Sequence, residues 1–355
     1  MQPVSTINIP SSSRKLAPVF VLGSPRSGTT LLYDMLLSAG GFAVYLAESN
    51  VFNLLAPRFG DLSVRSNREK LVEAWLQSKL FRASGLHAQV IRDRLLAECK
   101  NAGDFLRIIM AEICAAQGMQ RWAENSPEGM LYLPLIKRLI PDAVFIHILR
   151  DGRDVAASLS RRRFVRAFPW EDRHGLLGCG IYWEWIVRQG RGFGRTIPAD
   201  YMEVHFEKLL AQPQETLNRI GGFIEQQLNY EVIQRVAYGS LETPNTSFDQ
   251  DIRNFNPIGR WKTSFTSEQL LRFERLVGKT LVELGYEPAT NGSELGLNVS
   301  LSATRLLHLA YFRGKLIYKN SALIRSMLPA MAGADIDGIV QAEDHPAVIK
   351  QASTL

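Results

Sequence analysis

VFVLGSPRSGTTLLYDMLL, residues 19–37, joins an apolar run, a turn rich in glycine and serine, and an amphipathic segment. The apolar run predicts a buried strand over 18–22, and the amphipathic segment predicts a helix over 29–38. A helix that begins directly after such a turn presents unpaired backbone N–H groups and the positive end of its dipole. The stretch therefore predicts a loop that binds a phosphate-like anion.

The spacing of this turn, from Gly23 to Thr30, matches the Walker A pattern G-x-x-x-x-G-K-[ST] at every position except one. Thr29 stands where the pattern has its lysine, and a cation, Arg26, lies inside the loop instead. In a nucleoside-triphosphate enzyme that lysine reaches the β- and γ-phosphates. The residues alone leave three interpretations: a triphosphate site, a site for another anionic donor whose departing phosphate Arg26 neutralises, and a structural glycine turn.

A second candidate anion site follows another predicted strand. AVFIHIL (143–149) is a continuous apolar run, typical of a parallel strand covered on both faces, and RDGRDVAASL follows it directly. Because helical side chains lean toward the helix N-terminus, we expect Ser158 to approach Arg150 near the strand end. Two anion sites at two strand ends imply a nucleotide phosphorylated at two positions. The alternative is a surface arginine and a serine that faces the helix.

The composition is that of a globular protein with a sizeable core, since 46% of the 355 residues are hydrophobic and 21% are charged. A net charge of +6 suits an anionic ligand, and the absence of a Lys/Arg-rich tail argues against a nucleic-acid partner. No apolar run reaches the roughly 20 residues that span a bilayer, and the N-terminus lacks the apolar core of a signal peptide. With three widely spaced cysteines, the expected localisation is cytoplasmic, without a transmembrane segment.

Strands and helices alternate along the chain, which predicts an α/β fold: a doubly wound parallel sheet with helices on both faces. Further short strands are expected at 42–46 and 201–206. Thr266 and Gln269 form the pattern of a capping box that opens a helix over 267–284. The other expected helices are 68–82, 102–117, 128–140, 153–160, 176–190 and 213–226, with one or two more within 300–328.

The chain divides into four predicted parts. A lead-in covers 1–17, and the main domain covers 18–289. A C-terminal helical extension covers 290–330 and begins with a linker over 290–299. A tail covers 331–355.

Four segments, in this order, resemble the PAPS-dependent sulfotransferases, PAPS being 3′-phosphoadenosine 5′-phosphosulfate. They are PRSGTT (25–30), FIHILRDGRDVAASL (145–159), YMEVHFEKLLAQPQETLNRIGGFI (201–224) and IGRWKTSF (258–265). The resemblance is closer to the tyrosylprotein and bacterial branch than to the cytosolic phenol and steroid branch. It implies a sulfotransferase domain over 18–289 whose glycine loop is a P-loop-like phosphosulfate-binding loop.

The resemblance also implies where PAPS and its product, 3′,5′-adenosine bisphosphate, would bind. The glycine loop would hold the 5′-phosphosulfate, and Arg150 and Ser158 would hold the 3′-phosphate. Phe206 stands where relatives often place a tyrosine near the adenine, and Arg253 and Asn254 match the family only weakly. The full expected set is Arg26, Ser27, Gly28, Thr29, Thr30, Arg150, Ser158, Phe206, Arg253, Asn254, Gly259, Arg260, Trp261 and Lys262.

Glu48 is the expected catalytic base, because AES (47–49) resembles the segment in which tyrosylprotein sulfotransferases carry theirs. The acceptor hydroxyl must lose a proton as it attacks sulfur, and a carboxylate whose pKa is raised by burial can accept it. His174 is a second candidate base, since imidazole titrates near neutral pH, and it is equally an acceptor contact. Arg26 and Lys262 are expected to stabilise the departing phosphate without a metal. The alternative for Glu48 is an ordinary loop carboxylate.

Asn125 is a departure from the family. Relatives often carry a lysine before the proline of the segment that here is ENSP (124–127). Asparagine donates hydrogen bonds but brings no charge. Either Arg26 and Lys262 suffice, or the acceptor supplies a cation, or turnover is slow. Glu124 is then a candidate contact for a positively charged acceptor, its alternative being a solvated carboxylate.

The expected function is in-line transfer of the sulfuryl group from PAPS to a hydroxyl or amine of a small-molecule, glycan or lipid acceptor. A secreted-protein tyrosine is disfavoured because the chain shows no export anchor. Two rivals remain: a P-loop nucleotide kinase, and a non-catalytic nucleotide-binding protein on the same fold. The C-terminal helices are expected to cap the site, pair subunits of a homo-oligomer or touch a membrane surface.

Overall fold

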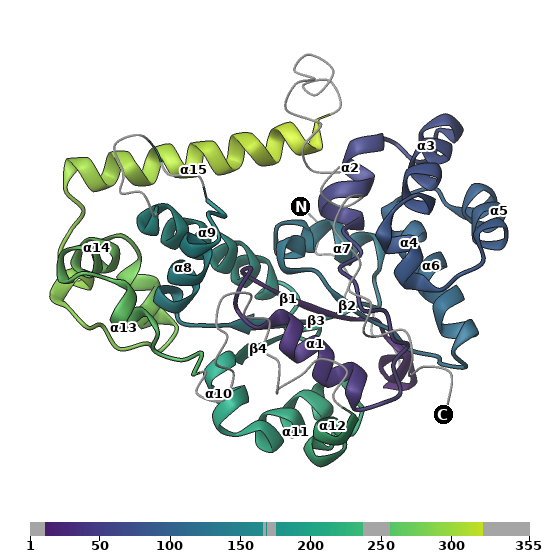
Figure 1. Cartoon of the computed structure of the whole chain (residues 1–355), viewed down its shortest axis with the longest axis horizontal. Helices are drawn as coiled ribbons and strands as arrows, with labels where there is room; N and C mark the ends of the chain where they lie inside the picture. Colours follow the sequence, from purple (N-terminus) through teal and green to yellow (C-terminus); the bar gives the residue numbers. More distant parts are fainter. Residues whose placement is uncertain (1–10, 166–167, 169–174, 237–255, 322–355) are drawn as a thin grey trace, which may run out of the picture.

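The computed structural model describes residues 11–165, 168, 175–236 and 256–321. Its centre is a parallel sheet in the order β2–β1–β3–β4 (Figure 1). The predicted α/β class, with a parallel sheet covered on both faces, is confirmed. The strands are β1 (Val19–Gly23), β2 (Ala123–Asn125), β3 (Val144–Leu149) and β4 (Tyr201–His205).

The chain leaves β1 toward β2 on one side and leaves β3 toward β4 on the other. The connections that follow β1 and β3 therefore diverge at the carboxyl ends of these two neighbouring strands. Parallel α/β sheets bind ligands at such a switch point. Both predicted anion sites, at 23–30 and at 150–158, follow these two strands.

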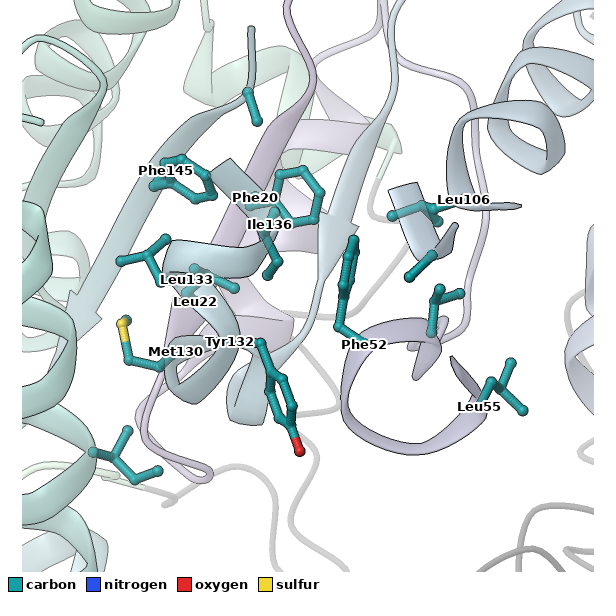
Figure 2. Packing of buried hydrophobic residues seen from close by; sticks show 14 of the residues in the cluster. Phe20, Leu22, Phe52, Leu55, Leu106, Met130, Tyr132, Leu133, Ile136 and Phe145 are labelled. Carbon is teal, nitrogen blue, oxygen red and sulfur yellow. The ribbon is translucent and has the colours of Figure 1, made fainter. Parts of the chain in front are cut away.

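Side chains of the central strands alternate between two cores. Val19, Val21 and Ile146 pack on one face of the sheet with apolar side chains of α1 (Thr29–Ser38) and α11 (Pro213–Ile224). On the opposite face, Phe20, Leu22 and Phe145 pack with residues of 130–136 and with Phe52 (Figure 2). Because both faces are buried, the strands are apolar at almost every position.

The helices form layers on both faces of the sheet. In Figure 1, α1 and α10 to α12 lie on one side, α8 and α9 lie on the other, and α3 to α6 lie beyond β2. The remaining bounds are η1 (Ser11–Leu16), η2 (Val51–Leu55), α2 (Ala56–Phe59), α3 (Arg65–Leu76), α4 (Lys79–Ser84), α5 (Ala88–Glu98), α6 (Ala102–Ala116), η3 (Pro127–Tyr132), α7 (Leu133–Leu139), α8 (Gly152–Arg161), α9 (Leu176–Gly194), α10 (Phe206–Ala211), α12 (Tyr230–Val236), α13 (Trp261–Ser264), α14 (Ser267–Glu283), η5 (Asn291–Ser293) and α15 (Val299–Asn320).

The predicted strand over 42–46 is wrong. Only an isolated bridge joins Ala43 to Trp122, and no ladder follows it. The side chain of Gln117 bonds both the N–H and the C=O of Val44, at 2.7 and 2.9 Å, so these groups cannot pair with a strand. The sheet instead uses β2, a strand of three residues that is too short to show a periodic pattern.

The predicted helix over 128–140 is divided into the 3₁₀ helix η3 and the α-helix α7. Pro134 has no N–H to continue an α-helical ladder from the preceding turn, so α7 begins afresh beside it. The predicted helix over 68–82 is also divided, because Ser78 caps α4 by accepting from the N–H of Phe81. Helix α5 was not expected.

The C-terminal part is more ordered than a linker followed by helices. The capping box of Thr266 and Gln269 is confirmed, with both reciprocal hydrogen bonds present. The buried Glu274 carboxylate accepts from the N–H groups of Ala289 and Thr290 and from the Thr290 hydroxyl, which ties the start of the predicted linker over 290–299 to α14, and the linker itself stays a prediction. One helix, α15, follows it, and the division of the chain into domains stays a prediction.

Candidate active site

The glycine loop adopts a conformation that requires its sequence. Arg26 and Gly28 both have left-handed backbone angles, with φ of 73° and 97°. A Cβ at Gly28 would lie 2.3 Å from the ring of Phe206, so only glycine fits. Gly28 is the N-cap of α1 and no side chain caps that helix. The first N–H groups of α1 are therefore directed at whatever anion the loop holds.

The loop and the end of β3 form one site. Arg26 Nε donates to Ser158 Oγ at 3.1 Å, and Arg150 Nη1 donates to the carbonyl oxygen of Arg26 at 2.8 Å. The guanidinium of Arg150 lies 4.5 Å from the centroid of the Phe206 ring, a cation–π contact. The tertiary structure thus brings together four residues that the sequence places on four separate elements.

The electrostatics of this site favour an anion. Burial, reinforced by the charges of Arg162, Arg150 and Arg161, lowers the pKa of Arg26 to about 10. The guanidinium stays charged at neutral pH, and an added phosphate would relieve this crowding of cations. Ser27 Oγ and Arg150 Nε are buried and have no hydrogen-bond partner among the described residues. Buried donors of this kind fit the oxygens of a phosphorylated ligand.

Asp154 of α8 anchors the fourth of the family-like segments, 258–265, beside the site. Its two carboxylate oxygens accept from the N–H groups of Gly259 and Trp261, at 2.8 and 2.9 Å. Arg150 Nη2 donates to the carbonyl of Pro257, which holds the same segment. Lys262 is exposed, with its ammonium 5.8 Å from the Trp261 ring, so its role at the departing phosphate stays a prediction. Arg253 and Asn254 lie outside the described residues.

Glu207 of α10 holds the segment that follows β3 in place. Its carboxylate accepts from the N–H of Asp151 at 2.9 Å and from the hydroxyl of Tyr286 at 2.9 Å. His147, expected in the core, is fully buried and its Nδ1 meets the hydroxyl of Tyr201. Burial lowers the pKa of His147 to about 3, so it is neutral at physiological pH.

Glu48, the expected catalytic base, lies between the Ala43 bridge and η2. Part of its side chain is exposed, yet desolvation by the surrounding protein raises the pKa of the carboxyl to about 7, with a further contribution from the charge of Glu128. The ammonium of Lys79 acts in the opposite direction. A carboxylate with a pKa near neutrality is matched to general-base catalysis.

Glu124 holds the residue that follows Glu48. One of its oxygens, Oε1, accepts from the N–H of Ser49 at 3.1 Å and from the Ser49 hydroxyl at 2.6 Å. The side chain is buried, which raises the pKa of the carboxyl to about 8, so a solvated carboxylate is excluded. Glu124, the middle residue of β2, therefore positions the segment that carries Glu48.

Comparison with known proteins identifies the family. Residues 18–230, more than half of the chain, match the family described as the sulfotransferase family. The chain belongs to this family. It is 24% identical over 287 residues to a putative protein-tyrosine sulfotransferase of Caenorhabditis briggsae, covering 77% of this chain and 90% of that one. It is 25% identical over 304 residues to the protein-tyrosine sulfotransferase of Drosophila melanogaster, covering 81% of this chain and 55% of that one.

A solved structure confirms the fold of this sulfotransferase. The sulfotransferase domain from the curacin biosynthetic pathway superposes with a TM-score of 0.51 and 18% identity, covering 76% of this chain and 98% of that domain. The predicted resemblance, including its closeness to the tyrosylprotein branch, is confirmed by these matches, and so is the prediction that the protein is a sulfotransferase enzyme.

Asn125 lies in β2, beside Glu124 and close to the first turn of α1. It is buried at the end of β2, and its Nδ2 lies 3.4 Å from Thr30 Oγ1 in the first turn of α1. Its Oδ1 has no hydrogen-bond partner among the described residues. The amide group therefore faces the first turn of α1, directly after the glycine loop. His174, the second candidate base, lies outside the described residues.

Three residues of the donor side were missed in the sequence: Asp154, Glu207 and Arg162. Asp154 and Glu207 lie inside the motifs RDGRD and the aromatic-Glu-x-Leu segment at 206–209, in which the predicted site residues are Arg150 and Phe206. Arg162 lies at the C-terminal end of α8, and its charge acts on Arg26. Only the folded structure shows which partner each side chain meets.

Two further predictions are that the protein uses no metal and that it has no transmembrane segment. No group of three His, Cys, Asp or Glu side chains in the described ranges is arranged to hold a metal ion, and metal-free transfer stays a prediction. Among the helices of the described residues, none combines the length and the apolar character that crossing a bilayer demands. The cytoplasmic localisation likewise stays a prediction.

Proposed function

We propose that this sulfotransferase transfers the sulfuryl group of PAPS to an acceptor hydroxyl in a single in-line step, with Glu48 as the general base. The observation that carries the proposal is the convergence of Arg26, Arg150 and Ser158 at the β1–β3 switch point. Two candidate anion-binding elements at one switch point suit a nucleotide with a 5′-phosphosulfate and a 3′-phosphate. PAPS would supply the sulfuryl group.

Each donor-side residue then has a distinct task. The loop N–H groups and Arg26 would bind the 5′-phosphosulfate and stabilise the negative charge that grows on the departing phosphate. Arg150 and Ser158 would bind the 3′-phosphate. Such transfers, like phosphoryl transfers, depend mainly on positioning and on preorganised charge. Asp154 and Glu207 contribute by fixing the backbone on either side of Arg150.

The structure disfavours a P-loop kinase as the alternative. A kinase needs a carboxylate near the phosphates to hold magnesium, and Asp151, which follows Arg150, is the nearest candidate in the sequence. Asp151 instead caps α8 by accepting from the N–H of Arg153 and forms an ion pair with the guanidinium of that residue at 2.8 Å. Thr29 also brings no charge to a γ-phosphate.

The acceptor class that we propose first is the phenolic hydroxyl of tyrosine in a peptide or protein. The relatives at 24–25% identity are named protein-tyrosine sulfotransferases. A phenol has a pKa of about 10, close enough to that of Glu48 for proton transfer during attack. A small-molecule, glycan or lipid hydroxyl is the alternative, and an amine acceptor would need the same base.

Calorimetry with 3′,5′-adenosine bisphosphate tests the donor site. We expect the wild type to bind it and Arg150→Ala to lose at least about tenfold in affinity, since a charged hydrogen-bonding group is removed. Arg138→Ala, at an exposed arginine of α7, is the matched control and should bind as the wild type does. Tighter binding of ATP–magnesium, with Arg150→Ala neutral, would instead support the kinase.

Transfer from ³⁵S-labelled PAPS tests the reaction and the acceptor. Tyrosine peptides, simple phenols, carbohydrates and lipid extracts are offered in parallel, and the product is identified by mass. Transfer to a tyrosine peptide that Glu48→Gln abolishes supports the proposal. Binding of the bisphosphate without transfer to any acceptor would support the non-catalytic alternative.

A further inference from the structure

Glu128, in the first turn of η3, is a half-buried carboxylate to which the proposed transfer step gives no task. The hydroxyl of Tyr182, in α9, donates to its Oε1 at 3.0 Å, and Lys319 Nζ, in α15, lies 3.8 Å from its Oε2. Burial and the charge of Glu128 raise the pKa of Tyr182, so the phenol keeps its proton at physiological pH. Two helices that are far apart in the sequence therefore hold one carboxylate between them.

The path of the chain brings Glu128 close to the segment that carries Glu48. Glu124, four residues before Glu128, accepts from the hydroxyl of Ser49 at 2.6 Å, and Ser49 directly follows Glu48. Helix η2 begins two residues after Ser49 and packs against η3, and buried side chains of both belong to one core cluster (Figure 2). The carboxyl groups of Glu48 and Glu128 therefore lie within electrostatic range of each other.

Among the described residues, the titratable groups that act on Glu48 are Glu128 from η3, Lys79 from α4 and Glu124 from β2. Desolvation raises the pKa of Glu48 most, the charge of Glu128 raises it further, and the charge of Lys79 lowers it. Glu124 is fully buried, and its own pKa is raised to about 8, so at neutral pH it is mostly protonated and brings little charge. Glu128 is therefore the main negative charge that Glu48 meets in this part of the chain.

We propose that Glu128 is a positioning residue through which α9 and α15 act on the base: its negative charge makes Glu48 a stronger base for the acceptor proton, and the ammonium of Lys319 reduces this effect. A negative charge beside a carboxylate disfavours a second negative charge, so that carboxylate binds a proton more readily. Tyr182 and Lys319 fix where the charge of Glu128 stands. The inference rests on the proposed function, in which Glu48 takes the proton of the acceptor.

The pH dependence of sulfuryl transfer tests the charge of Glu128. In Glu128→Gln, the midpoint of the rise of kcat/KM with pH should move down by roughly 0.5–1 pH unit, because the repelling charge is gone. Glutamine still accepts a hydrogen bond from the Tyr182 hydroxyl, so the variant should fold. Glu128→Asp keeps the charge and should keep a midpoint close to that of the wild type. A shift in Glu128→Asp as large as that in Glu128→Gln would overturn the proposal, because packing and not charge would then be responsible.

Lys319→Gln tests the part of α15. It removes a positive charge from beside Glu128, so the midpoint should move up, opposite to the shift in Glu128→Gln and smaller. Shifts of opposite sign cannot come from a general loss of stability, which would lower the rate at every pH. Glu215→Gln, at an exposed carboxyl of α11 on the other face of the sheet, is the matched control and should leave the midpoint unchanged. An unchanged or lower midpoint in Lys319→Gln would overturn the part assigned to α15.

A direct titration of Glu48 separates this proposal from the proposed function. Carbon-13 NMR of the glutamate carboxyl carbons follows its protonation without an acceptor, and the Glu48 signal is the one missing in Glu48→Gln. We expect a pKa of about 7 in the wild type and a lower value in Glu128→Gln. An equal Glu48 titration in both proteins would overturn the proposal, whatever the transfer rates. A shifted titration in a protein whose transfer does not depend on Glu48 would support the coupling of the two carboxyl groups and overturn only the role of Glu48 as the base.

Discussion

The two halves of the active site differ in what they are made of. The donor side consists of arginines and backbone N–H groups at the ends of β1 and β3, held by partners on α8 and α10. The acceptor side consists of the carboxyl groups Glu48, Glu124 and Glu128 on short or irregular segments. Under the proposed function, the donor would be bound by preorganised positive charge, whereas the acceptor would meet carboxyl groups, of which Glu48 and Glu124 have a pKa raised by desolvation.

Glu48→Gln should have the largest effect, because it removes the proposed base without changing the residues proposed to bind the donor. Transfer should fall by roughly a thousandfold because the general base is lost, while affinity for 3′,5′-adenosine bisphosphate stays unchanged. In the wild type, kcat/KM should fall as the pH drops below about 7, where the Glu48 carboxyl becomes protonated. Radiolabel transfer across a pH series measures both. An unchanged rate in Glu48→Gln would move the base elsewhere, with His174 the next candidate.

Gly28→Ala should distort the glycine loop and weaken binding of the donor. The new Cβ would collide with the Phe206 ring and would force alanine into a left-handed conformation, which we expect to cost about 3 kcal/mol of unfolding free energy and most of the bisphosphate affinity. Gly40→Ala is the matched control, because Gly40 has φ of 82° but no atom within 4 Å of its Cβ position. It should lose about 1 kcal/mol and keep its affinity. Equal losses in the two variants would show that the contact with Phe206 is unimportant.

Glu124→Gln tests whether the buried carboxyl of Glu124 keeps its proton in the folded protein at neutral pH. Burial raises the pKa of Glu124 from its ordinary value to about 8, so between about pH 5 and 8 the folded state retains a proton that the unfolded chain has lost. The free energy of unfolding of the wild type should therefore fall as the pH rises through this window, and the variant should lack on the order of 2 kcal/mol of that fall.

Urea denaturation at pH 5.5 and pH 8 measures the difference. Glutamine still offers an acceptor oxygen to the N–H of Ser49, so the variant should fold. Parallel slopes in wild type and Glu124→Gln would show that Glu124 is ionised throughout.

Asp154→Asn should have the smallest effect. Asparagine keeps one acceptor oxygen for the N–H groups of Gly259 and Trp261, so one of two charge-assisted hydrogen bonds is lost. We expect a loss of about 1 kcal/mol, seen as a fivefold to roughly tenfold weaker binding of 3′,5′-adenosine bisphosphate in calorimetry. Wild-type affinity would show that the 257–262 segment takes no part in donor binding.

The sequence predicted the regular parts of the fold because they repeat a local signal. The apolar runs of β1 and β3 and the capping box of α14 are fixed by neighbouring residues, and each lies where expected. A prediction of secondary structure failed where a side chain distant in the sequence decided the local structure. Gln117 bonds both backbone groups of Val44, so the strand predicted over 42–46 does not form.

The sequence by itself determined the family and the donor loop, since spacing and residue type suffice to specify a turn that directs N–H groups at an anion. It also supplied Glu48, through resemblance. Only the tertiary structure decided that Arg26, Ser158, Arg150 and Phe206 meet, because their contacts cross four elements. It alone showed that Glu124 positions the segment of Glu48 and that α15 reaches Glu128, because these contacts join residues that are far apart in the sequence.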